Sequence, residues 1–167
     1  MRLCGQQAVW NYEEENGLLT IQGVGAMEDY TEPEQVPWNS LMQEIKVVVI
    51  RDGITTVGDY AFAGCSNLQE VTLPGSVEIV GVFSFKGCTG LREIVIPEGV
   101  RVLASKAFQF CSALKKVYLP STLIDVDMRA FGKCESLEEV FYQGSEEQWE
   151  QIMISRSCLL YTSDAAD

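Results

Sequence analysis

Four cysteines recur at an interval of 23 residues and are the side chains best suited to nucleophilic, redox or metal chemistry. They are Cys65, Cys88, Cys111 and Cys134. A catalytic thiol needs a neighbouring base, usually histidine, and the chain contains no histidine. A zinc ion needs ligands arranged around it, whereas residues at a constant repeat spacing form a column. The pattern therefore favours neither a catalytic nor a metal-binding role for these thiols.

Disulfide bonds between these cysteines are also disfavoured. Side chains stacked on neighbouring strands lie about 4.8 Å apart, whereas the Cβ atoms of a disulfide lie about 3.5–4.5 Å apart. We therefore expect a column of buried thiols that act as small apolar side chains. Cys4 and Cys158 are expected to be unpaired. This use of cysteine is compatible with an oxidising or a reducing compartment.

Carboxylates are numerous, but none has the spacing of a catalytic pair. One acidic run covers residues 13–15, and a second acidic segment covers residues 28–34. Calcium accepts carboxylate ligands, yet the D-x-D-x-D-G loop pattern is missing. Gly23-x-Gly25 is not a dinucleotide fingerprint, because Glu28 stands where its third glycine would fall. We predict solvent-exposed acidic loops and no catalytic, metal-binding or cofactor-binding residue.

The negative net charge of the chain disfavours anionic partners. The 167 residues, enough for one domain, include 24 acidic and 12 basic residues and carry a formal net charge of −12. Nucleic acid and anionic membrane surfaces attract lysine and arginine clusters, so neither is expected to bind. No apolar run approaches the roughly 20 residues of a membrane-spanning helix, and no signal peptide is visible.

A 23-residue repeat determines the expected fold. Each unit has a Phe-x-x-Cys segment followed by Leu-x-x-Val-x-Leu, and a half unit with Val48, Ile50, Ile54 and Val57 precedes the set. The matching positions are Phe62, Phe85, Phe108 and Phe131; Leu68, Leu91, Leu114 and Leu137; Val71, Ile94, Val117 and Val140; Leu73, Ile96, Leu119 and Tyr142; and Val80, Leu103 and Val126.

One unit contains one predicted strand and one predicted turn. Alternation at the end of Leu-x-x-Val-x-Leu is typical of a strand, and stacked strands pair in parallel at roughly 4.8 Å. Proline ends three of the strands because it has no N–H to donate. The Ala-Phe-x-Gly-Cys stretch predicts a tight turn or short helix, in which we expect a positive φ at Gly64, Gly87 and Gly132. Phe110 departs from this pattern.

These repeats resemble the BspA-type leucine-rich repeats. Residues 61–68 (Ala-Phe-Ala-Gly-Cys-Ser-Asn-Leu) and 91–97 (Leu-Arg-Glu-Ile-Val-Ile-Pro) look like the consensus of that family. The resemblance covers about residues 4–152, and Ser84 stands where the family usually has alanine. It implies an α/β solenoid with a parallel β-sheet on one face. It also implies a secreted or cell-surface bacterial protein that binds host or neighbouring-cell proteins, although a fold alone does not fix a function.

The two ends of such an array must cover its core. Residues 1–45 predict an N-terminal cap made of a β-hairpin, a loop and a short helix through Leu41 and Ile45. The solenoid itself is expected to span residues 46–144.

Residues 145–153 predict a C-terminal capping helix. It opens with the capping box Ser145-Glu146-Glu147-Gln148, and Trp149 and Ile152 are expected to cover the last coil. Residues 154–167 continue no repeat and are either a translated library adapter or a genuine tail.

Outward positions of the strands form a continuous surface that a partner could contact. The central row turns from aliphatic to aromatic along the chain, which favours a protein-binding face. The alternative is that these residues only stabilise the sheet through cross-strand contacts. The candidate binding residues are Val49, Thr72, Val95, Tyr118 and Phe141 of the central row, with Lys116 and Glu139 of a flanking row.

We therefore expect a non-enzymatic module for protein interaction or adhesion, without cofactors and monomeric as an isolated segment. Its location is expected to be extracellular or at the cell surface, as the family resemblance implies. The alternatives are a passive spacer that projects another domain, and a carbohydrate-binding module that would use Tyr118 and Phe141 as an aromatic platform.

Overall fold

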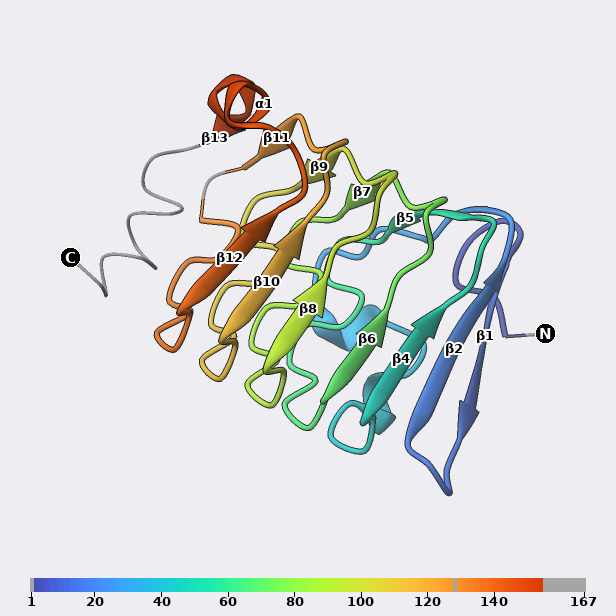
Figure 1. Ribbon diagram of the computed structural model, residues 1–167. Helices are drawn as coiled ribbons and strands as arrows, with labels where there is room; N and C mark the ends of the chain where they lie inside the picture. The colour runs from blue at the N-terminus through green and yellow to red at the C-terminus, as the bar shows by residue number, and fades with distance from the viewer. Residues whose placement is uncertain (1, 128, 155–167) are drawn as a thin grey trace.

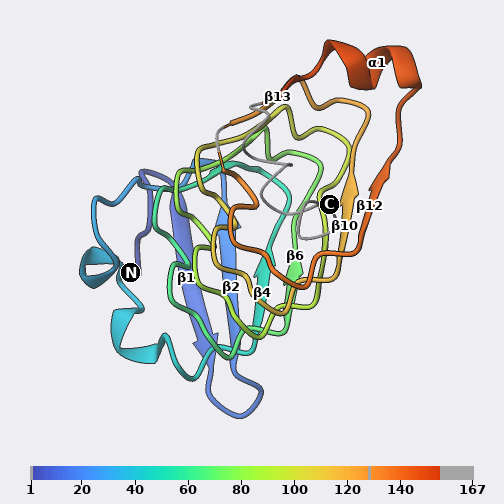
Figure 2. The same ribbon diagram turned by 90° about the vertical axis from the view of Figure 1, so that its left-hand side faces the viewer.

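Short strands joined by tight turns form stacked coils in a computed structural model, which describes residues 2–127 and 129–154 (Figure 1). The strands along one side follow one another in chain order from the N-terminal hairpin to the last coil. Viewed from the C-terminal end, the coils lie one behind another, and the helix stands at a corner of the stack (Figure 2).

The first side of the solenoid carries the predicted parallel strands. A hairpin of two antiparallel strands begins it, and each later strand pairs in parallel with a neighbour. The 23-residue register is the predicted one, since Ile94 pairs with Val117 and Val117 with Val140. The strands are β1 (Ala8–Glu13), β2 (Leu18–Gly23), β4 (Val47–Ile50), β6 (Glu70–Thr72), β8 (Glu93–Val95), β10 (Lys116–Leu119) and β12 (Glu139–Tyr142). The predicted solenoid with a parallel sheet and an N-terminal hairpin is confirmed.

A second parallel sheet runs along another side and was not predicted. Its strands are mostly two residues long, too short to show an alternating pattern in the sequence. Their inward residues, such as Val80 and Leu103, were recognised only as repeated apolar positions. The strands, in spatial order, are β13 (Met153–Ile154), β11 (Asp125–Val126), β9 (Val102–Leu103), β7 (Ile79–Val80), β5 (Ile54–Val57) and β3 (Gly25–Ala26).

The core is organised around a column of stacked aromatic rings. Phe62, Phe85, Phe108 and Phe131 are buried, and their ring centroids lie 5.1–5.3 Å apart. Trp38 extends the column at its N-terminal end, 5.5 Å from Phe62. Its indole Nε1 donates a hydrogen bond of 2.8 Å to the carbonyl oxygen of Ala61. The cap therefore continues the packing of the repeats with an aromatic ring of its own.

The N-terminal cap contains two short 3₁₀ helices rather than one helix through Leu41 and Ile45. They are η1 (Pro33–Gln35) and η2 (Asn39–Leu41). Ile45 follows η2 and is buried. Trp10 of the hairpin packs on Trp38 in a T-shaped arrangement with ring centroids 5.7 Å apart, so the hairpin and this segment contact each other.

The C-terminal helix α1 (Glu146–Gln151) begins with the predicted capping box. The Ser145 hydroxyl accepts a hydrogen bond from Gln148 N–H, and the Gln148 side chain accepts one from Ser145 N–H. The helix ends at Gln151, before the predicted residue 153, and Met153–Ile154 pair with β11. The ring centroids of Trp149 and Tyr142 lie 5.0 Å apart, and Ile152 is buried. The tail from residue 155, with Cys158, lies outside the described residues.

The turn side of each coil contains residues in the left-handed backbone region. Gly64 and Gly87 have the predicted positive φ, at 84° and 73°. The prediction for Gly132 was wrong, because Gly132 aligns with Ala63 of the first full coil. In the fourth coil Lys133 takes the left-handed position with φ 61°, and in the third coil Phe110 takes it with φ 63°.

The left-handed backbone of Phe110 is expected to cost stability that glycine would restore. Phe110→Gly should be about 1 kcal/mol more stable than Phe110→Ala, since only the alanine keeps a Cβ atom at positive φ. Gly87→Ala should destabilise by a similar amount, because its new Cβ would meet nothing closer than 3.9 Å and only the backbone strain would remain. Urea unfolding of the variants measures these differences, and equal stability of Phe110→Gly and Phe110→Ala would contradict them.

Ser84 is expected to lower stability relative to the alanine of other coils. Its side chain is fully buried, and its hydroxyl has no hydrogen-bond partner among the described residues. Ser84→Ala should raise the free energy of unfolding by about 1 kcal/mol in urea unfolding. The matched change Ala107→Ser, at the equivalent buried position of the next coil, should lower it. A loss of stability in Ser84→Ala would refute this account.

Candidate binding surface on the first sheet

The five residues of the predicted central row lie at equivalent outward positions of the first side. Val49 pairs with Thr72, and Val95 pairs with Tyr118, which pairs with Phe141. Their chain neighbours at Val48, Ile94 and Val117 are buried in the core. The exposed fractions of Val95 and Phe141 are 54% and 38%, which are large for apolar side chains.

Two aromatic rings form the C-terminal end of this row. Tyr118 and Phe141 stack with ring centroids 4.8 Å apart and an angle of 17° between the ring planes. Val140 is 40% exposed although it occupies the core position of β12, because β12 is the last strand in its sheet. A hollow of about 280 Å³ is lined by Val140 and Tyr142 of β12 and by Trp149 of α1. Apolar surface therefore gathers at this end of the solenoid.

The predicted flanking residues Lys116 and Glu139 lie side by side on the same face. Lys116 Nζ is 3.8 Å from Glu139 Oε1, and about half of each side chain is exposed. An ion pair this exposed contributes little to stability. Both groups therefore remain accessible to a partner that contacts the aromatic pair beside them.

A groove of about 510 Å³ crosses the face between β6 and β8. It is lined by Glu70 and Thr72 of β6, by Glu93 and Val95 of β8, and by Pro97 after β8. Within the described residues, the hydrogen-bonded ladder of the first side stops at this line, giving the orders β1-β2-β4-β6 and β12-β10-β8. The groove was not predicted, because the repeat pattern is the same on both sides of it and carries no signal for a break.

The column of thiols lies inside the solenoid, as predicted, and its residues are fully buried. The thiol of Cys88 donates a hydrogen bond to the carbonyl oxygen of Phe62, at a distance of 3.3 Å between sulfur and oxygen. Cys111 and Cys134 make the same contact with Phe85 and Phe108, at 3.2 and 3.1 Å. Each of these thiols therefore bonds to the coil before its own.

Two further properties of the described residues bear on function. Cysteine, aspartate and glutamate side chains in this part of the chain form no group of three that could hold a metal ion. In the same part of the chain, no helix has the length and apolar character needed to cross a membrane.

Comparison with protein families identifies the repeats. Residues 40–159 match the model of the BspA-type leucine-rich repeat region, in six copies. The chain belongs to this family. The match ends beyond residue 152, where the resemblance noted in the sequence stops, and includes the first residues of the predicted tail. A comparison with curated protein sequences gives no match.

Solved structures of bacterial leucine-rich repeat proteins share the fold. A leucine-rich cell surface protein from Faecalibacterium prausnitzii is 23% identical with a TM-score of 0.71, and the match covers 87% of this chain and 40% of that one. A leucine-rich repeat protein from Eubacterium ventriosum is 22% identical with a TM-score of 0.63, and the match covers 93% of this chain and 44% of that one. A leucine-rich repeat protein from Bacteroides ovatus is 24% identical with a TM-score of 0.54, and the match covers 81% of this chain and 40% of that one. The chain thus spans less than half the length of these proteins.

Thiol burial makes stability depend on pH in the alkaline range. Burial raises the pKa of Cys65 from 9.0 to about 12, so the folded protein keeps a proton that the unfolded chain loses. The contribution of such thiols to the free energy of unfolding should therefore be constant below about pH 9 and fall at higher pH, by about 1.4 kcal/mol per pH unit for each thiol.

Urea unfolding between about pH 8 and 10.5 tests this expectation. Cys65→Ala should show a shallower fall than the wild type, because one buried thiol is missing. Equal slopes for the two proteins would contradict the link between Cys65 and alkaline stability.

Proposed function

We propose that the chain is a non-enzymatic interaction module that binds a protein partner through the outer face of its first side. The observation that carries the proposal is the stacked pair at the end of the central row, in which Tyr118 is partly exposed and Phe141 is 38% exposed. Tyrosine is enriched at the energetic centres of protein interfaces, where a rigid ring buries apolar area and a hydroxyl keeps a polar contact.

The surroundings of this pair have the composition of an interface. Val95 provides further exposed apolar surface beside the groove, while Lys116 and Glu139 supply charges at the margin. An apolar centre with a polar rim is the usual anatomy of a binding site for a protein. The groove between β6 and β8 offers a recess for a protruding side chain or loop of the partner.

We further propose a role in adhesion at a cell surface. Membership in the BspA-type repeat family supports this role, as does structural similarity to a cell surface protein of Faecalibacterium prausnitzii. The partner would be a protein on a host cell or on a neighbouring bacterium. Its contact area on this chain would include Val49, Thr72, Val95, Tyr118, Phe141, Lys116 and Glu139.

The two rings could instead only stabilise the sheet through cross-strand packing. The variants are therefore chosen to distinguish a role in stability from a role in binding. Tyr118→Thr/Phe141→Thr removes both rings but keeps β-branched side chains, which favour strands and occur in the same row at Thr72. Ile79→Ala/Ile124→Ala is the matched control, because both isoleucines are exposed and lie along the second sheet, Ile79 in β7 and Ile124 directly before β11.

The full chain is screened by surface plasmon resonance against extracellular matrix proteins, plasma proteins and glycans. We expect the wild type to bind a protein with saturable affinity. Tyr118→Thr/Phe141→Thr should weaken this affinity at least about tenfold, whereas the isoleucine control should change it less than about twofold. Circular dichroism confirms that each variant is folded. Undiminished binding by the ring variant would refute the proposed face. Binding to glycans alone, or no binding at all, would favour the carbohydrate-binding or spacer alternative.

A further inference from the structure

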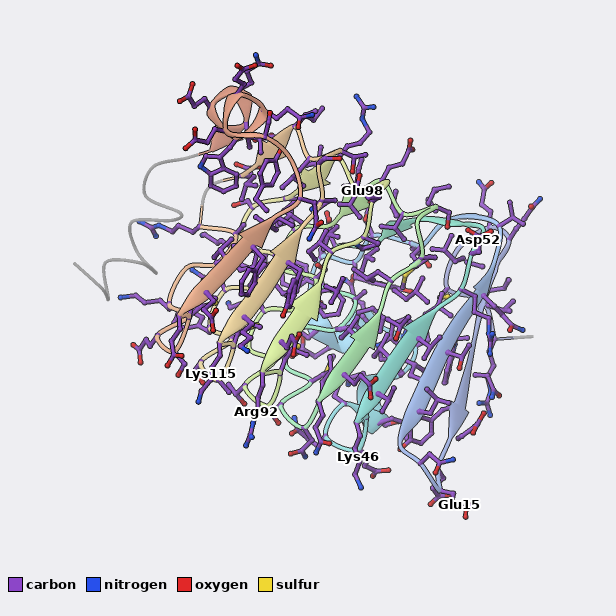
Figure 3. The ribbon with its side chains drawn as sticks, in the orientation of Figure 1. Glu15, Lys46, Asp52, Arg92, Glu98 and Lys115 are labelled. Carbon is purple, nitrogen blue, oxygen red and sulfur yellow. The ribbon has the colours of Figure 1, made fainter. Side chains whose placement is uncertain are left out.

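The basic residues of this acidic chain are concentrated in its middle. Residues 83–133 contain eight of the twelve lysine and arginine residues and four acidic residues, a formal net charge of +4 in a chain of −12. Some of these bases lie in the loops that precede the first-side strands, where Arg92 and Lys115 are drawn in Figure 3. Others lie on the turn side, together with aromatic residues.

On the turn side, five residues form an aromatic and cationic group, here named the turn-face cluster: Tyr60, Phe83, Lys86, Lys106 and Phe110. The rings of Tyr60 and Phe83 lie 4.9 Å apart. Lys86 Nζ lies 4.8 Å from the centre of the Phe83 ring and 5.9 Å from that of Phe110. Lys106 Nζ lies 5.3 Å from the centre of the Phe83 ring. Two ammonium groups are thus held around one ring by cation–π attraction.

Four of the five residues in the turn-face cluster have a left-handed backbone conformation. Tyr60, Phe83 and Lys106 occupy one repeat position, with φ of 62°, 56° and 58°. Phe110 has φ 63° at the position that Gly64 and Gly87 fill in earlier coils. A left-handed backbone costs a residue with a Cβ atom about 1–2 kcal/mol. Arg129 and Lys133 of the fourth coil have the same left-handed backbone, so this conformation belongs to the turns of the repeat. The Phe110 side chain is 45% exposed and adds little to the core.

The two lysines of the cluster are available to an anion. In the described part of the chain, no carboxylate lies within 4.0 Å of Lys86 or Lys106, and both ammonium groups lie over aromatic rings. An ammonium group over a ring keeps N–H donors for a further acceptor. A carboxylate is a suitable acceptor, and the exposed Phe110 ring beside it suits an apolar group.

We propose that the turn-face cluster is a second binding surface, which takes an acidic peptide segment of a partner protein. Its carboxylates would pair with Lys86 and Lys106, and an apolar side chain would lie on Phe110. A short acidic peptide fits the cluster, because its carboxylates can pair with the two lysines while an apolar side chain lies on the exposed Phe110 ring. A polyphosphate has no apolar group for that ring. This surface is separate from the face formed by Tyr118 and Phe141.

The test uses a fluorescein-labelled peptide of sequence Glu-Glu-Phe-Glu-Glu and fluorescence anisotropy at low ionic strength. Lys86→Gln/Lys106→Gln should weaken binding at least about tenfold. The control Arg92→Gln/Lys115→Gln changes the net charge equally, at the exposed loops of Figure 3, and should change binding less than about twofold. Phe110→Gly, which relieves the strained backbone, should weaken binding several-fold while the protein stays folded.

Two further comparisons separate the turn-face cluster from the first-side face and from a general affinity for anions. Tyr118→Thr/Phe141→Thr should bind the peptide like the wild type, so failure of the first-side face as a binding site would leave this result unchanged. A polyphosphate of equal charge should bind more weakly than the peptide. Three outcomes would each overturn the proposal. They are an equal loss of peptide affinity in the two glutamine double variants, an unchanged peptide affinity in Phe110→Gly, and tighter binding of polyphosphate than of the peptide.

Discussion

A single 23-residue coil cannot enclose its own apolar side chains, and the whole architecture follows from the need to stack such coils. Four sets of contacts hold neighbouring coils together: paired strands on two sides, backbone hydrogen bonds between the turns, stacked phenylalanine rings in the centre, and thiols that donate to the carbonyl groups of the preceding coil. Small residues such as Cys111 and Ala107 are fully buried in the same core.

The repeat pattern predicted most of the architecture, because each inward position is occupied by an apolar residue in nearly every coil. The parallel first-side strands, the hairpin and the capping box of α1 were predicted from alternation, turn residues and the Ser145–Gln148 spacing. The second sheet was missed because a strand of two residues has no period to detect. The prediction for Gly132 failed because it relied on residue type, whereas the place of this glycine in the repeat corresponds to Ala63.

The candidate surfaces differ in how far a sequence can reveal them. Outward positions such as Tyr118 and Phe141 follow from alternation alone, and the structure adds their stacking. The group around Phe83 could not be predicted in the same way. Three of its members share one repeat position and two come from other positions, and they meet where the backbone turns left-handed at residues whose type gives no sign of it. The usual signal for such a conformation is glycine, which Phe110 replaces.

The interrupted ladder between β6 and β8 has a mechanical consequence. The second sheet continues across the same line, with β5, β7 and β9 paired in turn, so the coils are linked along one side more firmly than along the other. A load that bends the solenoid therefore meets the least resistance from backbone hydrogen bonds at this line. A molecule wedged into the groove would stiffen the rod, and tension along the rod would in turn alter the width of the groove.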